Sequence, residues 1–402
     1  MTRARRPFAA AALAGLALAG LMLAETAART QAATATLTGF ARLAADTLAP
    51  GPPSGAFLDG GRRGDAPFAA QPVQGVSALA PAGDGWWWAL VDNGFGTRLN
   101  SPDARLRVYR LRPSWREPGG GEGTVEVSAD LVQLADPGRR LPFRIVHDDD
   151  PARPLTGSDL DPESLAVADD GTFWLGDEFG PFLLHVDGTG RVLEAPIEAP
   201  GVRSPDHPLV PPADRGRTSE ATVGRSRGFE GLSRLPGTTR LVALLEAGSA
   251  DDTPGCTRLL EFDITTRGWT GRGWRYRFEP LGVAASEVVC FAPDGCLVVE
   301  RDDGHGPRAR LKRVFAVTLG PPGGEVAKRP VADLLRIADP HGLAASGSLF
   351  TFPFITTEAV WPLDRRTLVL ANDNNFPATG GRQPGVLDAT EFIRLRLHAP
   401  LW

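Results

Sequence analysis

The sequence is poor in lysine and has no excess of positive charge. Lys312 and Lys328 are the only lysines, and nearly all of the positive charge comes from arginine. The 402 residues carry a formal net charge of −5, whereas proteins that bind nucleic acid usually present a basic patch. The composition therefore gives no reason to expect a nucleic-acid partner.

Several catalytic signatures are also missing. The chain has no Gly-x-Ser-x-Gly elbow, no His-Glu-x-x-His, no phosphate-binding P-loop and no Cys-x-x-Cys, which argues against an α/β-hydrolase serine esterase and the common zinc and nucleotide sites. The six histidines are scattered without ligand spacing. His305 follows the stretch Glu300-Arg301-Asp302-Asp303, and we expect it to act as an acid or base.

Cysteine is scarce as well. Cys290 and Cys296 flank a predicted hairpin turn at Asp294-Gly295, so they are either a disulfide or two small core residues. Cys256 falls in a predicted loop and has no evident partner. The three cysteines therefore leave one unpaired in either case.

Long apolar runs are confined to the beginning of the chain. Arginines precede an apolar run from Phe8 to Leu23 and a stretch of small residues, so residues 1–30 are predicted to be a secretory signal peptide of the Sec or twin-arginine type. No later run reaches membrane-spanning length. We expect residues 31–402 to be one domain, periplasmic or secreted, monomeric and without a stable membrane anchor.

The most informative stretch is Asp161–Pro181, DPESLAVADDGTFWLGDEFGP. Glu163 is followed by alternating apolar residues, an Asp170-Gly171 turn, a second apolar run and the pair Asp177-Glu178. Asp-Gly suits a tight turn because glycine accepts a positive φ without steric cost. The pattern predicts a β-hairpin that brings Glu163 back towards Asp177 and Glu178.

This plan recurs along the chain. Copies begin at residues 77, 163, 230, 287 and 358, with Ser77 replacing the leading glutamate in the first. The variable spacing favours blades with loop insertions over a solenoid. We therefore predict an all-β protein, a β-propeller with five visible blade repeats and five or six blades, closed by strands from both ends of the chain. The alternative, a pair of β-sandwiches, does not explain the repeated acids.

In a propeller the repeated acids would meet at one mouth of the central channel. So many carboxylates oppose one another's ionisation, and a hard divalent cation such as calcium would neutralise them. Alternatively, arginine partners, protonation or a purely structural capping role would account for the acids. The predicted metal ligands are Glu163, Asp177, Glu178, Glu230, Glu287, Glu300, Glu358 and Asp373.

Four ordered blocks carry a family resemblance: the Asp161–Pro181 stretch, RGFEGL, SEVVCFAPDGCLVVERDD and TEAVWPL followed by LVLANDNNFP. Together they resemble the phytase-like, "esterase-like activity of phytase" family of exported bacterial proteins over roughly residues 70–397. The resemblance implies a propeller-like β fold and hydrolysis of phosphate or carboxylic esters. The family tends to begin its third block with Asn-Arg-Gly-Phe-Glu-Gly, where this chain has Ser226.

These observations predict a metal-dependent hydrolase that acts on a small anionic substrate, a phosphate ester, at the channel mouth. The expected catalytic residues are Glu163, Glu230, Arg227, Arg301 and His305, with the two arginines gripping phosphate. Two alternatives remain: a noncatalytic propeller that binds a small molecule or an envelope partner, and a calcium-dependent lactonase-type hydrolase.

Overall fold

Short β-strands joined by tight turns make up most of the computed structural model, which describes residues 32–210, 220–344, 347–377 and 379–402. The predicted signal peptide, residues 1–30, lies outside the described residues. Within the described part, one short 3₁₀ helix interrupts the strands, η1 (Gly306–Arg308), and no helix is long and apolar enough to cross a membrane.

The first blade contains the Trp-rich hairpin. Its strands are β4 (Val76–Gly83), β5 (Trp86–Val91), β6 (Arg107–Ser114) and β7 (Thr124–Val127), with β8 (Val132–Gln133) also on β6. The turn between β4 and β5 consists of Asp84 and Gly85, with φ angles of 52° and 78°. Positive φ at both turn positions is the geometry of a type I′ hairpin, which explains the Asp-Gly pair.

Three further blades are separate four-stranded antiparallel sheets. The second blade is β9 (Pro162–Val167), β10 (Phe173–Asp177), β11 (Phe182–Val186) and β12 (Ile197–Glu198). The third is β13 (Phe229–Arg234), β14 (Arg240–Leu245), β15 (Cys256–Asp263) and β16 (Gly268–Arg277). The fourth is β17 (Ala284–Cys290), β18 (Gly295–Arg301), β19 (Lys312–Thr318) and β20 (Ala327–Asp333).

The fifth blade joins the two ends of the domain. It consists of β23 (Thr357–Asp364), β24 (Thr367–Asn372), β25 (Thr390–Leu397) and, as its outer strand, β1 (Ala35–Leu43). Closure by strands from both ends is confirmed, although they complete the fifth repeat instead of forming a sixth blade. Two short pairs supplement the blades. β2 (Leu48–Ala49) pairs with β3 (Gln71–Pro72) in a separate sheet, and β21 (Ile337–Ala338) pairs with β22 (Leu349–Phe350) and also with β1 of the fifth blade.

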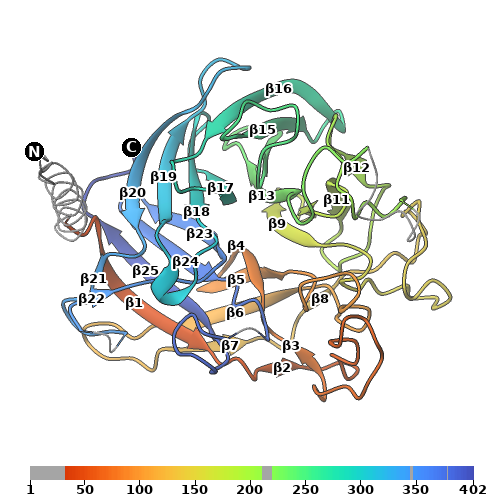
Figure 1. The fold of residues 1–402 in the computed structure, drawn as a ribbon, viewed down its shortest axis with the longest axis horizontal. Helices are drawn as coiled ribbons and strands as arrows, with labels where there is room; N and C mark the ends of the chain where they lie inside the picture. The colour runs from red at the N-terminus through yellow and green to blue at the C-terminus, as the bar shows by residue number, and fades with distance from the viewer. Residues whose placement is uncertain (1–31, 211–219, 345–346, 378) are drawn as a thin grey trace, which may run out of the picture. The chain divides into compact units, whose positions relative to one another are not determined.

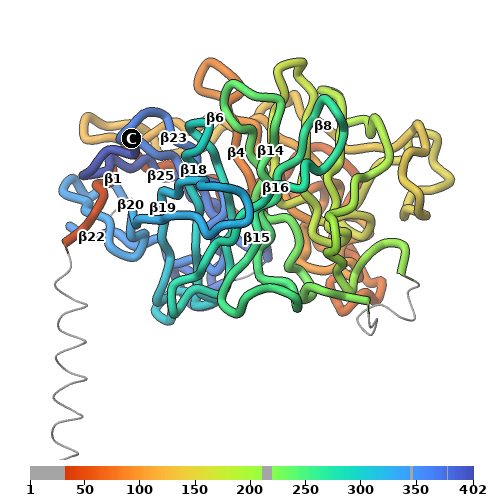
Figure 2. Tube along the Cα trace, turned by 90° about the horizontal axis from the view of Figure 1, so that it is seen from above, coloured from red at the N-terminus to blue at the C-terminus, as the bar shows by residue number. Residues whose placement is uncertain are grey.

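The innermost strands form a ring. β9 contacts β4 and β13, β17 contacts β13 and β23, and β23 contacts β4, so the described residues form a five-bladed β-propeller around these strands (Figure 1). Figure 2 shows the same arrangement turned by 90°. Clusters of buried apolar side chains fill the spaces between blades, and Trp361 of β23 packs against three of them.

Each innermost strand carries a β-bulge near its beginning. The register of the ladder shifts at Ser77, Glu163, Glu230, Ser286 and Glu358. A bulge inserts one residue and redirects its side chain, so these five residues occupy equivalent positions. In the fourth copy that position is held by Ser286, and the sequence alignment that placed Glu287 there was wrong by one residue.

Candidate functional site

The bulges and the ends of the second strands meet around one cavity of about 390 Å³. The second strand of each blade pairs with the bulged innermost strand, and one residue follows the later of the two ladder pairs that flank each bulge. These five residues therefore occupy equivalent positions: Asp92, Glu178, Glu246, Arg301 and Asp373. All five line the cavity together with Glu163, Glu230 and Glu358. The fold thus brings together side chains that are up to 281 residues apart in sequence, from Asp92 to Asp373.

Acidic groups dominate this cavity, which we call the acidic cavity. Its lining contains three guanidinium groups, those of Arg225, Arg227 and Arg301. It contains nine carboxyl groups, those of Asp92, Asp161, Glu163, Glu178, Glu230, Glu246, Asp303, Glu358 and Asp373. Full ionisation would leave an excess of six negative charges, so the arginines alone cannot compensate the acids.

Burial and mutual repulsion raise the pKa of these carboxyl groups. The pKa of Glu163 lies well above its ordinary value because the group is buried and faces Asp161, and burial next to Asp373 does the same to Glu358. Burial raises the pKa of Asp373 to about 6. Burial and mutual repulsion therefore oppose full ionisation of the site when no cation is bound.

Three of the acids form a compact group of oxygen atoms. Asp161, Glu163 and Glu178 each offer one carboxylate oxygen, and these oxygens all lie within 4.8 Å of one another. Asp161 Oδ1 is buried and accepts no hydrogen bond of good geometry from the described residues, although the carboxyl group lies beside Asn93 and Glu163. A buried acceptor without a donor is costly, and an all-oxygen donor set suits calcium or magnesium better than zinc. The group therefore fits a hard divalent cation.

Two arginines form ion pairs with Glu246, the acid at the second-strand end of the third blade. Arg227 Nη1 donates to Glu246 Oε2 at 2.6 Å, and Arg301 donates through Nη2 to Glu246 Oε1. Arg301 also donates to Asp303 at 2.9 Å, and its side chain is only 7% exposed, compared with 29% for Arg227. Arg227 is thus the more accessible of the two arginines expected to grip an anion.

Three residues predicted as metal ligands do not line the acidic cavity. Asp177 accepts hydrogen bonds from the backbone amides of Asp161 and Gly180, both at 2.7 Å, and so holds the strand end in place. Glu287 follows the bulge and accepts from the amide of Val288 at 2.8 Å. For both residues, strand alternation directs the side chain away from the cavity.

Glu300 is the third of these residues and belongs to a buried ion pair within the fourth blade. It accepts hydrogen bonds from the Tyr276 hydroxyl at 2.6 Å, Lys328 Nζ at 2.8 Å and the amide of Glu279 at 2.6 Å. Its carboxylate is fully satisfied in the interior of the blade. The strand-end position that faces the cavity belongs to its neighbour, Arg301.

His305 does not reach the acidic cavity either. Its Nδ1 accepts a hydrogen bond from the amide of Ile355 at 3.2 Å, and its Nε2 lies 3.3 Å from Asp388 Oδ2. These contacts tie two loops together, and the expectation of an acid or base at the site was wrong in its placement.

Asp161 is the residue of this group of three acids that the sequence did not single out. It lies two residues before the Glu163 bulge, where the other copies have Gly75, Gly228, Ala284 and Thr356. Comparison of repeats selects positions that recur, and Asp161 occurs in one blade only. The sequence could have indicated it through its place two residues before Glu163, in Asp161-Pro162-Glu163-Ser164.

Ser226 lies between Arg225 and Arg227 in the lining of the acidic cavity. Its backbone is in the left-handed region, with φ of 49°. Asparagine tolerates this region better than serine. The asparagine of the resembled family at this position therefore has a conformational explanation, beyond its capacity as a polar ligand.

The fold and site define a five-bladed β-propeller with a buried acidic mouth. Residues 71–376 match the phytase-like family, described as "esterase-like activity of phytase". The match covers most of the sequence, and the chain belongs to this family.

One curated relative is an uncharacterized secreted protein of Arthroderma benhamiae, 30% identical over 125 residues, which are 26% of this chain and 24% of the relative. The chain thus matches about a quarter of that relative's length. It is also similar to solved structures, among them a GH43 β-1,3-galactosidase, with a TM-score of 0.41, 10% identity and coverage of 82% of this chain and 91% of that one.

A further similar structure is virginiamycin B lyase from Staphylococcus aureus, with a TM-score of 0.34, 11% identity and 80% coverage of both chains. Similarity at this level assigns no activity to the present chain.

Proposed function

We propose that this protein is an exported, divalent-cation-dependent hydrolase of small esters that works in the acidic cavity. The observation that carries the proposal is the group Asp161, Glu163 and Glu178, with three buried carboxylates and an Asp161 Oδ1 that accepts no hydrogen bond of good geometry from the described residues. The description of the family as esterase-like and phytase-like supports ester hydrolysis. The secreted relative supports export.

Asp161, Glu163 and Glu178 would hold the cation, with calcium as the best match to their oxygen atoms. A bound divalent cation polarises the ester and lowers the pKa of a coordinated water. Burial of the three carboxylates excludes bulk solvent from the site and strengthens their attraction for a cation.

Glu230 is the candidate proton carrier. Its carboxyl shares a hydrogen bond with that of Glu178, an arrangement that requires one proton between them, and burial raises the pKa of both. A carboxyl group with a raised pKa next to the reacting atoms can accept a proton from water and return it to the leaving group. The sequence predicted Glu230 to be a catalytic residue, and an acid–base role is the one we propose for it.

Arg227 is the candidate anion contact. It is more exposed than Arg301, and its Nη2 lies 4.0 Å from Asp303, so it has donor capacity beyond its bond to Glu246. Arg301 then serves to keep Glu246 and Asp303 in place. Because acids outnumber arginines in the lining, a small monoester suits the cavity better than a polyphosphate such as phytate.

Hydrolysis assays test this proposal. Protein would be incubated with phytate, p-nitrophenyl phosphate and p-nitrophenyl acetate, with calcium and then with a chelator. We expect cation-dependent hydrolysis that Glu163→Gln abolishes and Glu126→Gln preserves, since Glu126 is an exposed glutamate of β7 in the first blade.

Inactivity across the panel at all cation concentrations would refute the hydrolase and favour the noncatalytic alternative. Hydrolysis restricted to the carboxylic ester would select the lactonase-type alternative, which shares the site.

A further inference from the structure

A second cavity lies at the other end of the innermost strands, where the hairpins turn. Its volume is about 1020 Å³, compared with about 390 Å³ for the acidic cavity, and the two cavities share no lining residue. All five blades contribute to it through β4, β9, the β13–β14 turn, β17 and β23. We call it the hairpin-side cavity.

The floor of the hairpin-side cavity is apolar. Ala80, Leu165, Leu232 and Val289 come from four innermost strands, and the partly exposed ring of Trp361 comes from the fifth. Cavities of several hundred Å³ with apolar walls and a few polar groups are typical sites for small molecules. The floor therefore suits the apolar body of a ligand.

Its lining contains one more basic group than acidic groups, whereas acids dominate the acidic cavity. Two arginines and one carboxylate line the hairpin-side cavity, namely Arg234, Arg240 and Asp169. Arg234 donates to Asp169 through both Nη atoms, but the Asp169 side chain is 86% exposed, and such a surface pair contributes little stability. Arg234 Nε is buried without a partner among the described residues.

Arg240 is committed elsewhere, because it donates to the buried Glu261 at 3.1 Å. Arg234 is therefore the group that can serve an anionic ligand.

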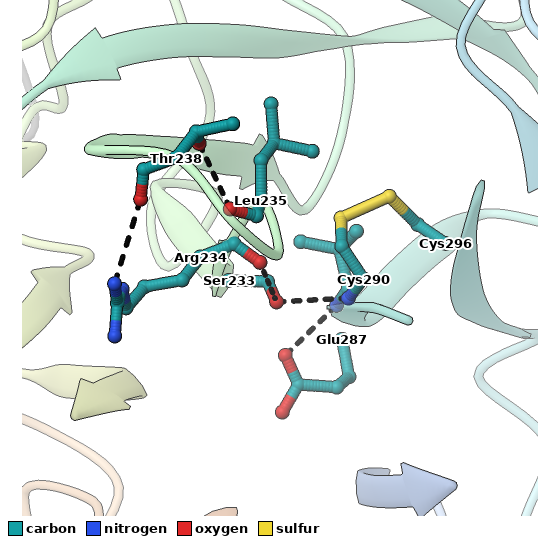
Figure 3. Close-up of a disulfide and its surroundings, with 8 residues drawn as sticks. Ser233, Arg234, Leu235, Thr238, Glu287, Cys290 and Cys296 are labelled. Carbon is teal, nitrogen blue, oxygen red and sulfur yellow. Dashed lines mark hydrogen bonds between the residues drawn. A yellow bond between two sulfur atoms is a disulfide. The ribbon is translucent and has the colours of Figure 1, made fainter. Parts of the chain in front are cut away.

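The wall beside Arg234 is held in a fixed position. Ser233 Oγ accepts a hydrogen bond from the amide of Cys290 at 2.8 Å, which ties the third blade to the fourth. Cys290 forms a disulfide with Cys296 across the β17–β18 hairpin (Figure 3). A preformed wall lowers the entropy cost of binding.

We propose that the hairpin-side cavity binds a small organic anion with an apolar body and one anionic head, a carboxylate or a sulfonate. The apolar body lies on the Trp361 floor, and the head pairs with Arg234. This site is separate from the acidic cavity and does not depend on the proposed hydrolase activity.

The probes are 8-anilinonaphthalene-1-sulfonate, followed by its fluorescence, and octanoate as a competitor, with octanol as the uncharged comparison. We expect saturable 1:1 binding of the fluorescent probe, and displacement by octanoate at concentrations at least tenfold below those of octanol. Arg234→Gln should weaken binding about tenfold, and Trp361→Ala should also weaken it. Arg112→Gln, an exposed arginine on β6, should leave it unchanged.

Far-UV circular dichroism of each variant establishes that it is folded. The comparison of octanoate with octanol uses the unaltered protein and so tests the charge requirement even if a variant unfolds. The absence of saturable binding, equal displacement by octanoate and octanol, or an unchanged affinity in folded Arg234→Gln would overturn the proposal. Loss of probe binding in folded Glu163→Gln would also overturn it, since that change lies in the other cavity.

Discussion

Asp161 and Glu178 meet twice in the second blade. The amide of Glu178 donates to the Asp161 carbonyl at 2.9 Å, and oxygens of their two carboxyl groups lie within 4.8 Å of each other. The backbone hydrogen bond fixes the residue that precedes β9 against the residue that follows β10. The ladder of the blade thus sets the geometry of the proposed cation site, and changes in individual side chains should test it without unfolding the blade.

Glu163 lies at the β-bulge of its strand, whereas Glu287 lies one residue after the bulge of its own. Glu163→Gln should lower calcium affinity at least tenfold, whereas Glu287→Gln should leave it unchanged, because Glu287 lies outside the acidic cavity. Burial raises the pKa of Glu287 well above its ordinary value, so a neutral glutamine is a close substitute. Isothermal titration calorimetry measures both affinities, and an equal loss in the two variants would disprove the register argument.

Cation-free protein should lose stability as the pH rises. Burial raises the pKa of Asp373 to about 6 and that of Asp177 to about 7. Between about pH 4 and pH 7 the folded state therefore binds protons that the unfolded chain has released, and the free energy of unfolding falls with increasing pH.

From pH 5 to pH 8 we expect a loss on the order of 4 kcal/mol, measured by urea denaturation in the presence of a chelator. Calcium should stabilise the protein more at pH 8 than at pH 5, because the carboxyl groups are then ionised. A free energy of unfolding that increases over this range without cation would contradict the assignment.

Arg301 should be a stabilising brace. Its side chain is 7% exposed and pairs with Glu246, which is 3% exposed, and removal of one partner leaves a buried charge uncompensated. Arg301→Gln should reduce the free energy of unfolding by about 3 kcal/mol. Arg112→Gln should cost less than about 1 kcal/mol, because Arg112 and its partner Glu126 are 45% and 54% exposed. Equally small losses in urea denaturation would show that Arg301 is not a brace.

Ser226 should limit stability through its backbone conformation. With φ of 49°, Ser226→Asn should raise the free energy of unfolding by about 0.5 kcal/mol, and Ser226→Val should lower it by about 1 kcal/mol. Thermal melts distinguish the two variants. A valine variant as stable as the asparagine variant would remove the conformational explanation.

The blade architecture could be predicted because turns and apolar alternation are local. Asp84-Gly85 of the first copy forms a tight turn between two paired strands, as the repeated Asp-Gly pattern predicts. The repeated start positions also identified Ser77 as the equivalent of Glu163, which the bulges confirm. The exact number of blades depends on the pairing of β1 with β25. These strands are far apart in the sequence, so local patterns could not predict their pairing.

The register of the fourth copy could not be found from turn spacing. Between the last hairpin pairs, Asp170-Gly171 are the third and fourth of five loop residues, but Asp294-Gly295 are the fourth and fifth. Alignment on the Asp-Gly pair therefore shifts that copy by one residue, and in a strand a shift of one residue turns a side chain to the opposite face. This explains why Glu287 was chosen in place of Ser286.

Calcium titration of the chelator-treated protein at pH 8 tests the central claim most directly. The account predicts saturable binding that raises the melting temperature, and a loss of that effect in Asp161→Asn while Glu126→Gln behaves like the unaltered protein. Failure of calcium and of magnesium to bind, or an Asp161→Asn variant that binds calcium as well as the unaltered protein, would contradict a cation site at Asp161, Glu163 and Glu178.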